Sequence, residues 1–262
     1  MIFIQPSIDP VIISLGFLDI RWYSMAYIVA FLLGLYLIKF FNKKIKSNIT
    51  NKKLDDFLIW SIFGVILGGR IGYIIFYQFA YFIENPLYLF YIWKGGMSFH
   101  GGLIGIILSI FLFTKKNNLE FFLLADFISL VAPIGLFFGR LANFINVELI
   151  GRVTDFPFAI IYSTVDNLPR HPSQLYEALF EGIILFLILL YVIIKNNYNL
   201  KYGYISGLFL TLYGSFRFLI EFIREPDPHI GLIFNIFSLG QILCIPLIFF
   251  GILLILNKKN YA

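Results

Sequence analysis

GRLANFINVELIG, residues 139–151, follows directly on a long apolar run and contains an arginine, two asparagines and a glutamate. Such groups are costly in hydrocarbon, so a charged Arg140 at the end of an apolar segment indicates a functional site. The rest of the chain indicates the fold around this stretch and the side of the membrane that it faces.

The composition predicts a membrane protein that crosses the bilayer several times. Of 262 residues, 60% are hydrophobic and 13% are charged, whereas an ordinary soluble domain is about 25% charged. A span needs roughly 20 apolar residues, so the apolar runs predict an all-α polytopic fold with about seven transmembrane helices. The runs cover residues 24–41, 57–79, 98–113, 121–141, 173–194, 203–223 and 232–256.

The chain is predicted to form a single transmembrane domain over residues 1–262, because no linker or shift in composition divides it. Residues 1–21 are expected to be a partly inserted lead-in on the outer side, with Pro6 and Pro10 interrupting any helix. A small outer loop region is predicted at about residues 142–172, with a short strand within residues 155–163.

The positions of the lysines predict the orientation. All lysines except Lys94 lie after the first, third and fifth runs or at the C-terminus. These are alternate connections, which is the positive-inside pattern. The N-terminus is therefore predicted outside and the C-terminus in the cytoplasm. The net charge of +5 follows from this topology, so no nucleic-acid partner is expected.

The arginines are distributed differently and avoid the lysine-rich connections. The chain uses arginine at positions where it does not use lysine. This choice indicates a need for the planar guanidinium fork, which binds phosphate or carboxylate. For some of them, an interfacial anchor paired with a nearby acid is an equal alternative: Arg21, Arg152 and Arg170. Arg70 is predicted near mid-membrane, where it needs a carboxylate or a wet cavity. The glycines beside it, Gly68, Gly69 and Gly72, are expected to let helices pack closely.

Other polar residues in the runs have simpler interpretations. His100 stands at the outer end of the third run, where a histidine can exchange a proton or only form structural hydrogen bonds. No metal site is predicted, because His171 and His229 lack ligand spacing. Asp126 is assigned no reaction role, and Cys244 is expected to be a core thiol.

Helical spacing places several polar groups on common faces. Glu177 and Glu181 are four residues apart and share one face. In the sixth run, steps of four, four and three stack polar side chains along one face, and these are Tyr213, Arg217, Glu221 and Arg224. The polar residues of the last run look like packing groups: Asn235, Ser238 and Gln241.

The predicted topology brings many of these side chains to the outer half of the membrane, from four runs and one loop. They are His100, Arg140, Asn143, Glu148, Glu177, Glu181, Arg217 and Glu221. A wet, positively charged cavity facing the outer leaflet would account for them. An anionic phospholipid headgroup is the expected occupant of such a cavity.

The chain resembles the prolipoprotein diacylglyceryl transferase family over nearly its whole length, and five sequence blocks in the family's order carry the resemblance. The blocks are GGRIGY (68–73), SFHGGLIG (98–105), GRLANFINVELIG (139–151), RHPSQLYE (170–177) and YGSFRFLIEFIREPD (213–227). Two departures are Val147, where the family pattern leads us to expect glycine, and a short segment between Arg152 and Arg170.

The resemblance implies an enzyme of the bacterial inner membrane, with its site facing the outer leaflet. The reaction would move the diacylglyceryl group of phosphatidylglycerol onto the lipobox cysteine of a prolipoprotein signal peptide, forming a thioether and releasing glycerol phosphate. No cofactor or metal is implied. By this analogy Arg140 and Arg217 bind the phosphate, and His100 deprotonates the thiol, with Glu148 as the rival base.

The analogy gives supporting roles to further residues. Asn143, Glu148 and Gly151 would shape the headgroup site, while Tyr23, Tyr213 and Glu221 would orient the arginines.

Two other classes of membrane protein stay open on residue patterns alone. A transporter for an anionic solute also needs arginines within the membrane, but its sequence typically shows repeated halves, and no internal repeat is visible here. An intramembrane protease needs a serine with a base or paired aspartates, and Asp126 has no second aspartate within the runs.

Overall fold

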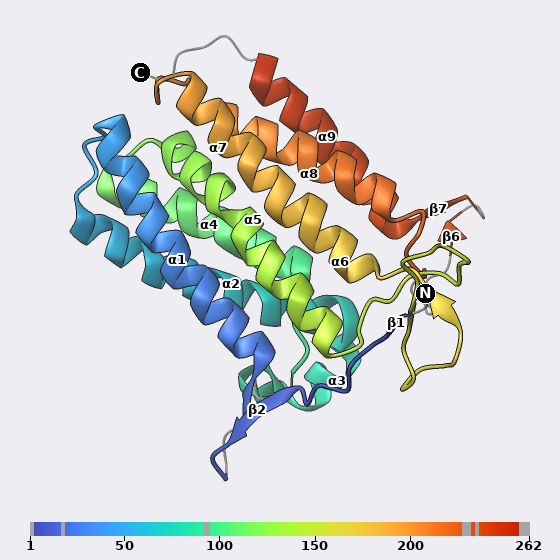
Figure 1. The fold of residues 1–262 in the computed structure, drawn as a ribbon. Helices are drawn as coiled ribbons and strands as arrows, with labels where there is room; N and C mark the ends of the chain where they lie inside the picture. Colours follow the sequence, from blue (N-terminus) through green and yellow to red (C-terminus); the bar gives the residue numbers. More distant parts are fainter. Residues whose placement is uncertain (1–2, 17–18, 92–94, 227–231, 234–235, 257–262) are drawn as a thin grey trace. The chain divides into compact units, whose positions relative to one another are not determined.

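The computed structural model describes residues 3–16, 19–91, 95–226, 232–233 and 236–256. The chain is mostly helical (Figure 1) and divides into two compact units. The first unit comprises Met1–Leu37 and Asp126–Ala262, and the second comprises Ile38–Ala125. Two helices, α1 (Trp22–Ile45) and α5 (Phe121–Ile145), continue from one unit into the other. A single domain over residues 1–262 stays a prediction.

Within the described residues, five helical segments are long and apolar enough to cross a membrane, which confirms the expected class of a helical membrane protein. They are Trp22–Ile45, Asn51–Tyr77, Phe121–Ile145, Ser173–Lys195 and Leu239–Leu256. The helices α4 (Phe99–Asn117) and α8 (Tyr204–Ile220) account for the other two apolar runs. The topology of seven spans stays a prediction.

The first unit contains a long helical segment with an irregular middle. It consists of α6 (Ser173–Glu177), a π-helical stretch η3 (Ala178–Ile184) and α7 (Leu185–Lys195). This segment packs against α8, and α8 packs in turn against α9 (Leu239–Leu256), as Figure 1 shows. A π-helical stretch adds a residue to the turn and is frequent at functional sites. The sequence predicted one uninterrupted helix here, because the hydropathy of residues 173–194 does not reveal the wider turn.

Asp126 caps the start of α8, which explains a carboxylate in an apolar run. Its side chain accepts hydrogen bonds from the backbone N–H of Gly203 at 2.7 Å and of Ser206 at 2.7 Å, and from Ser206 Oγ at 2.6 Å. The first N–H groups of a helix lack partners within the helix and favour a negative charge. Asp126 therefore has a structural partner at a helix N-terminus.

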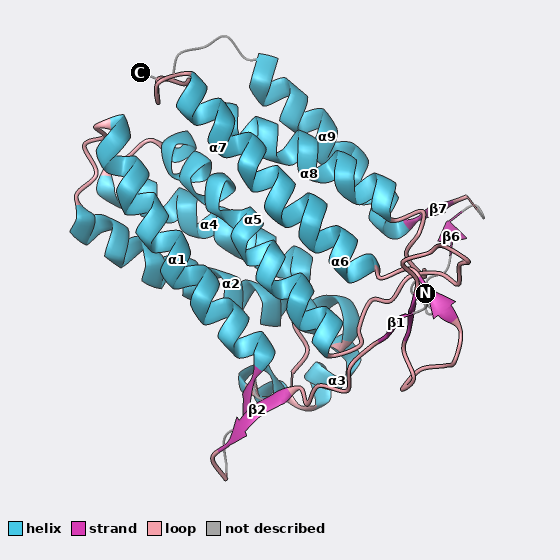
Figure 2. Ribbon diagram, viewed as in Figure 1, coloured by secondary structure: helices cyan, strands magenta, loops and turns pink. Residues whose placement is uncertain are grey.

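Short strands form the loop regions of the first unit (Figure 2). β1 (Phe3–Ile4) pairs in parallel with β4 (Ile160–Ile161), and β4 pairs with β5 (Pro169–Arg170) in antiparallel fashion. β4 confirms the strand predicted within residues 155–163. Two hairpins were not predicted: β2 (Val11–Ser14) with β3 (Asp19–Arg21), and β6 (Leu232–Ile233) with β7 (Phe237–Ser238). The last run therefore begins as a hairpin, and the predicted helix start at residue 232 is wrong.

The second unit is built on close contact between two glycine-rich helices. These are α2 (Asn51–Tyr77) and α4, and α3 (Phe79–Glu84) with the 3₁₀ helix η1 (Pro86–Phe90) follows α2. A Cβ atom added at Gly72 would lie 2.7 Å from the Cα of Gly101. Only glycine allows two helix backbones to approach so closely. The packing role predicted for the glycines beside Arg70 is confirmed at Gly72.

Arg70 is buried in the second unit, where it binds backbone carbonyl groups. Its guanidinium donates to the carbonyl oxygens of Tyr88 at 2.6 Å, Leu89 at 3.2 Å, Gly95 at 2.5 Å and Gly96 at 3.2 Å. It also lies over the Tyr88 ring, 4.6 Å from the centroid. The predicted need for a carboxylate or a wet cavity is wrong, because the connection after α2 folds its carbonyl groups around the guanidinium.

Candidate active site

Arg140 lies near the end of α5 and reaches two carboxylates on the α6–η3 segment. Its Nε is 2.8 Å from Glu177 Oε2, and its Nη2 is 3.3 Å from Glu181 Oε2. Its Nη1 donates to Asn143 Oδ1 at 3.5 Å, one helical turn further on. The side chains of both glutamates are fully buried, whereas the Arg140 side chain is 15% exposed. Buried carboxylates thus hold this guanidinium in place while part of the side chain stays accessible.

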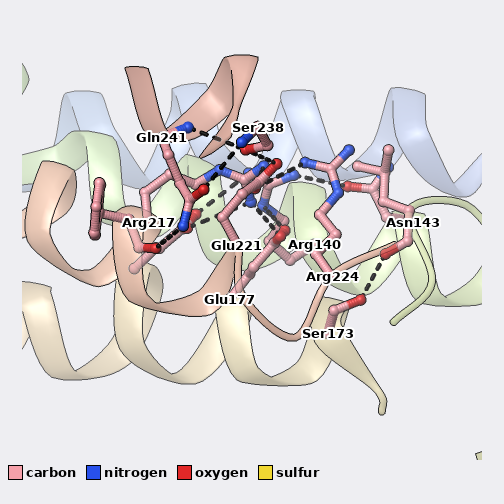
Figure 3. A network of polar contacts seen from close by, with 12 residues as sticks. Arg140, Asn143, Ser173, Glu177, Arg217, Glu221, Arg224, Ser238 and Gln241 are labelled. Carbon is pink, nitrogen blue, oxygen red and sulfur yellow. Dashed lines mark hydrogen bonds and ion pairs between the residues drawn. The ribbon is translucent and has the colours of Figure 1, made fainter. Parts of the chain in front are cut away.

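Arg217 lies on α8 and joins the same carboxylates from the other side. Its Nη1 forms an ion pair with Glu177 Oε1 and is 3.9 Å from Glu181 Oε1. Its Nη2 is 2.6 Å from Glu221 Oε2, four residues along the chain. Glu177 therefore bridges two arginines from different helices, and the labelled side chains converge in Figure 3.

Glu221 extends these contacts to Arg224 and to the last helix. Arg224 Nη1 is 3.7 Å from Glu221 Oε2, and Ser238 Oγ donates to Glu221 Oε1 at 3.0 Å. The backbone N–H of Ser238 in turn donates to Gln241 Oε1 at 3.0 Å. The interpretation of Ser238 as a packing group is wrong, because Ser238 binds Glu221 of the site, whereas the side chain of Gln241 contacts the Ser238 N–H and the Phe218 carbonyl. Asn235, which had the same interpretation, lies outside the described residues.

We call these six charged residues the ionic cluster: Arg140, Glu177, Glu181, Arg217, Glu221 and Arg224. The cluster pairs three guanidinium groups with three carboxylates. The sequence predicted a net positive cavity, and the described cluster is instead balanced in formal charge. Buried ions need partners at close range, and each arginine of the cluster has at least one carboxylate oxygen 3.7 Å away or closer.

A second polar group adjoins Arg140 and links α1 to the loop after α5. Asn143 Nδ2 donates to Glu148 Oε2 at 2.9 Å and is also hydrogen-bonded to the Tyr23 hydroxyl. The Tyr23 hydroxyl donates to Glu148 Oε2 at 3.2 Å. The described contacts of this hydroxyl are thus with Asn143 and Glu148, and Asn143 connects it to Arg140. Asn143 belongs to the last turn of α5, so the loop begins later than the predicted residue 142.

The backbone around Glu148 is held in an unusual conformation. Val147 has φ 57° and Leu149 has φ 56°, both left-handed. Such a φ is a clear outlier for a β-branched residue such as valine, and Val147 is the position where the family pattern predicted glycine. The Glu148 carbonyl accepts from Gln174 Nε2 at 2.6 Å, and its N–H donates to the Asn143 carbonyl at 2.9 Å. These contacts aim the Glu148 carboxylate at Tyr23.

Gly151 lies where the loop backbone passes closest to the segment leading into α6. Its N–H donates to the His171 carbonyl at 3.0 Å, and an added Cβ would lie 2.6 Å from the His171 Cβ. The absence of a side chain is therefore required by packing. Its carbonyl accepts from Arg170 Nη1 at 3.1 Å.

The arginines of the loop between α5 and α6 have structural partners. Arg170 Nη2 is 2.7 Å from Asp166 Oδ2, and Arg170 Nη1 is 3.3 Å from Glu225 Oε2. The hydrogen bond from Arg170 holds the pKa of Asp166 below its usual value. Arg152 Nε donates to the Arg224 carbonyl at 3.0 Å. The alternative of structural pairing is thus the one that the geometry supports for Arg170.

Two further predicted site residues are Tyr213 and His100. Tyr213 is buried on α8, one turn before Arg217, and stacks on Phe209 with centroids 5.6 Å apart. It lies close enough to Arg140, Glu181 and Arg217 to interact with their charges. His100 belongs to the second unit, in the first turn of α4, which Ser98 caps by accepting from the Gly101 N–H at 3.3 Å. The described residues of the first unit bring together eight of the site positions: Tyr23, Arg140, Asn143, Glu148, Glu177, Glu181, Arg217 and Glu221.

Two residues that contribute to the site, Gln174 and Ser238, received no site role from the sequence. Gln174 is fully buried, where it accepts from the Tyr162 hydroxyl at 2.9 Å and donates to the Glu148 carbonyl. Ser238 binds Glu221 as described above. Gln174 and Ser238 each stand near the start of a helix, and a polar residue there is a signal that the sequence offers. That signal does not identify the group that each residue binds.

Comparison with known proteins agrees with this geometry. The family model described as prolipoprotein diacylglyceryl transferase matches residues 10–257. Three similar proteins are named phosphatidylglycerol–prolipoprotein diacylglyceryl transferase. The one from Photobacterium profundum is 51% identical, over 96% of this chain and 93% of its own length. The one from Vibrio parahaemolyticus is 50% identical, over 95% of this chain and 90% of its own length. The one from Aliivibrio fischeri is 49% identical, over 97% of this chain and 92% of its own length. The chain therefore belongs to the prolipoprotein diacylglyceryl transferase family.

Proposed function

We propose that the ionic cluster, together with Tyr23, Asn143 and Glu148, forms the active site for diacylglyceryl transfer at the outer face of the bacterial cytoplasmic membrane. The activity of the family is the transfer of a diacylglyceryl group from phosphatidylglycerol to a prolipoprotein, the first step of lipoprotein maturation. The acceptor in this proposal is the lipobox cysteine of the signal peptide.

The main support for this site is the bridge that Glu177 makes between Arg140 and Arg217. It places two guanidinium groups from different helices beside a single carboxylate, so one phosphate group can contact both. Guanidinium groups bind phosphate through paired, charge-assisted hydrogen bonds. An entering phosphodiester would exchange with the carboxylates for these donors.

The outward orientation has support within the first unit. α7 ends at Lys195, and α8 begins at Tyr204, just after Lys201. Arg217 lies in the last turn of α8, at the opposite end of that helix. Because lysine-rich ends face the cytoplasm, the ionic cluster would face outward.

The reaction exchanges one bond for another at the lipid glycerol. The cysteine thiolate attacks the glycerol carbon that carries the phosphate ester, so the S–C bond forms as the C–O bond breaks. Glycerol phosphate leaves with the bonding electrons. Arg140 and Arg217 stabilise the negative charge that develops on this leaving group, as positioned donors do in other sites.

The thiol must also lose its proton, since a free thiol has a pKa of about 8.5 and the thiolate is the nucleophile. His100 and Glu148 are the two candidate bases. The Glu148 carboxylate already accepts hydrogen bonds from Tyr23, Asn143 and, at 3.3 Å, Asn146 Nδ2. We therefore assign the deprotonation of the thiol to His100, and a positioning role to Glu148.

Incubating the purified protein with phosphatidylglycerol and a lipobox peptide tests the proposal. We expect the peptide to gain the mass of a diacylglyceryl group, and Arg140→Ala to abolish this gain while the protein stays inserted in the membrane. Normal transfer by Arg140→Ala would refute the phosphate assignment.

The orientation is tested separately, with a cysteine introduced in the loop at Val165, which is 50% exposed. An impermeant maleimide should label Val165→Cys in intact cells and should label Lys116→Cys only after lysis. The reverse pattern would contradict the outward site.

A further inference from the structure

Glu181 is a fully buried carboxylate in the middle of the ionic cluster, and the proposed reaction gives it no step. It lies in the π-helical stretch η3. Its carboxylate faces Arg140 from α5 and Arg217 from α8, at 3.3 Å and 3.9 Å. Glu177 from α6 shares both of these arginines.

Of the three carboxylates, Glu181 has the weakest contacts with positive charge. Glu177 is 2.8 Å from Arg140 and is also paired closely with Arg217. Glu221 is 2.6 Å from Arg217 and accepts from Ser238. The ion pairs of Glu181 are longer, at 3.3 Å to Arg140 and 3.9 Å to Arg217. Glu181 is therefore the carboxylate that the cluster neutralises least.

The balanced charge of the cluster has a consequence for binding an anion. A phosphodiester adds one negative charge to three guanidinium groups that three carboxylates already neutralise. An extra charge without a partner is strongly disfavoured in a buried site, and an ionisable group there tends to become neutral instead. A proton taken up by one carboxylate restores the balance.

We propose that binding of the anionic headgroup is coupled to the uptake of one proton, and that Glu181 accepts it. This inference rests on the proposed function, because the headgroup must enter the ionic cluster. The charged and titratable groups that face Glu181 in the first unit are Arg140, Glu177 and Arg217, with Tyr213 of α8 and the thiol of Cys244 of α9 nearby. Once neutral, Glu181 releases Arg140 Nη2 to the phosphate and can itself donate a hydrogen bond.

Calorimetric titration tests this coupling directly. Dioleoyl phosphatidylglycerol in mixed micelles is titrated into the detergent-solubilised protein between pH 6.5 and 8.5, in buffers of different ionisation enthalpy. We expect the wild-type protein to take up close to one proton on binding. Its affinity should then fall by up to about tenfold for each pH unit, as linkage requires for one proton.

Glu181→Gln distinguishes proton uptake from a structural role, because glutamine keeps the shape and removes the charge. This variant should take up no proton, show an affinity independent of pH, and bind the lipid more tightly than the wild type at pH 8.5. The control Glu84→Gln removes an exposed carboxylate on α3 and should keep the wild-type pH dependence.

Several results would overturn the inference. Binding without proton uptake by a wild-type protein that still transfers the diacylglyceryl group would refute the coupling and leave the proposed function standing. Proton uptake that persists in Glu181→Gln would assign the proton to another group, and weaker binding by this variant at every pH would indicate a structural role. Absence of both binding and transfer in the wild type would refute the two proposals together. If Glu181→Gln does not fold, the wild-type proton count decides.

Discussion

Replacing Arg217 by lysine tests whether the site needs the fork of a guanidinium or only its charge. Arg217 uses its two terminal nitrogens in different directions: Nη1 contacts Glu177, and Nη2 contacts Glu221 at 2.6 Å. Lysine has a single ammonium group on a flexible stem. It therefore keeps one of these contacts and loses the other.

The size of the effect follows from the contact that is lost. A hydrogen bond to a charged group contributes about 1.5–3 kcal/mol, and 1.36 kcal/mol corresponds to tenfold in rate. Arg217→Lys should thus lower kcat/KM for transfer roughly 10- to 150-fold. The value of kcat/KM should fall further if the guanidinium nitrogen that lysine lacks also donates a hydrogen bond to the phosphate.

The assay is the initial rate of diacylglyceryl transfer to a lipobox peptide, measured by mass spectrometry over a range of phosphatidylglycerol concentrations. Arg21→Lys is the matched control, because Arg21 is exposed in β3 and should tolerate the change. Thermal unfolding in detergent checks that both variants are folded. Wild-type kcat/KM in a folded Arg217→Lys protein would refute the requirement for the guanidinium fork.

Three other substitutions test separate parts of the structure. His100→Asn should lower kcat and remove an ionisation from the pH–rate profile; an unchanged profile would transfer the role of base to Glu148. Asp126→Ala should destabilise the protein by about 1–2 kcal/mol, the usual cost of removing a helix cap, and an unchanged melting temperature would refute the capping role. Val147→Gly should stabilise the protein by up to about 1.5 kcal/mol, because relief of a left-handed valine, about 1–2 kcal/mol, outweighs the entropic cost of glycine, about 0.5–1 kcal/mol. A lower melting temperature of Val147→Gly would contradict this.

The sequence alone predicted those features that depend on neighbours along the chain. Apolar runs predicted the membrane helices, because hydropathy over about 20 residues is a local property. Helical spacing predicted that Arg217 and Glu221 would face each other, and they form an ion pair at 2.6 Å. The glycine pattern around residue 70 predicted close helix packing, and Gly72 contacts α4.

The tertiary structure alone determined which groups from distant segments meet. Residue spacing within one helix cannot show that Glu177 pairs with arginines on α5 and α8, or that Ser238 of another segment binds Glu221. Arg70 shows the same limit, since its partners are carbonyl groups that became available only when the following loop folded. The physical reason is that the charge balance of a buried site depends on helix packing, which brings together residues 40 or more positions apart, such as Arg217 and Glu177.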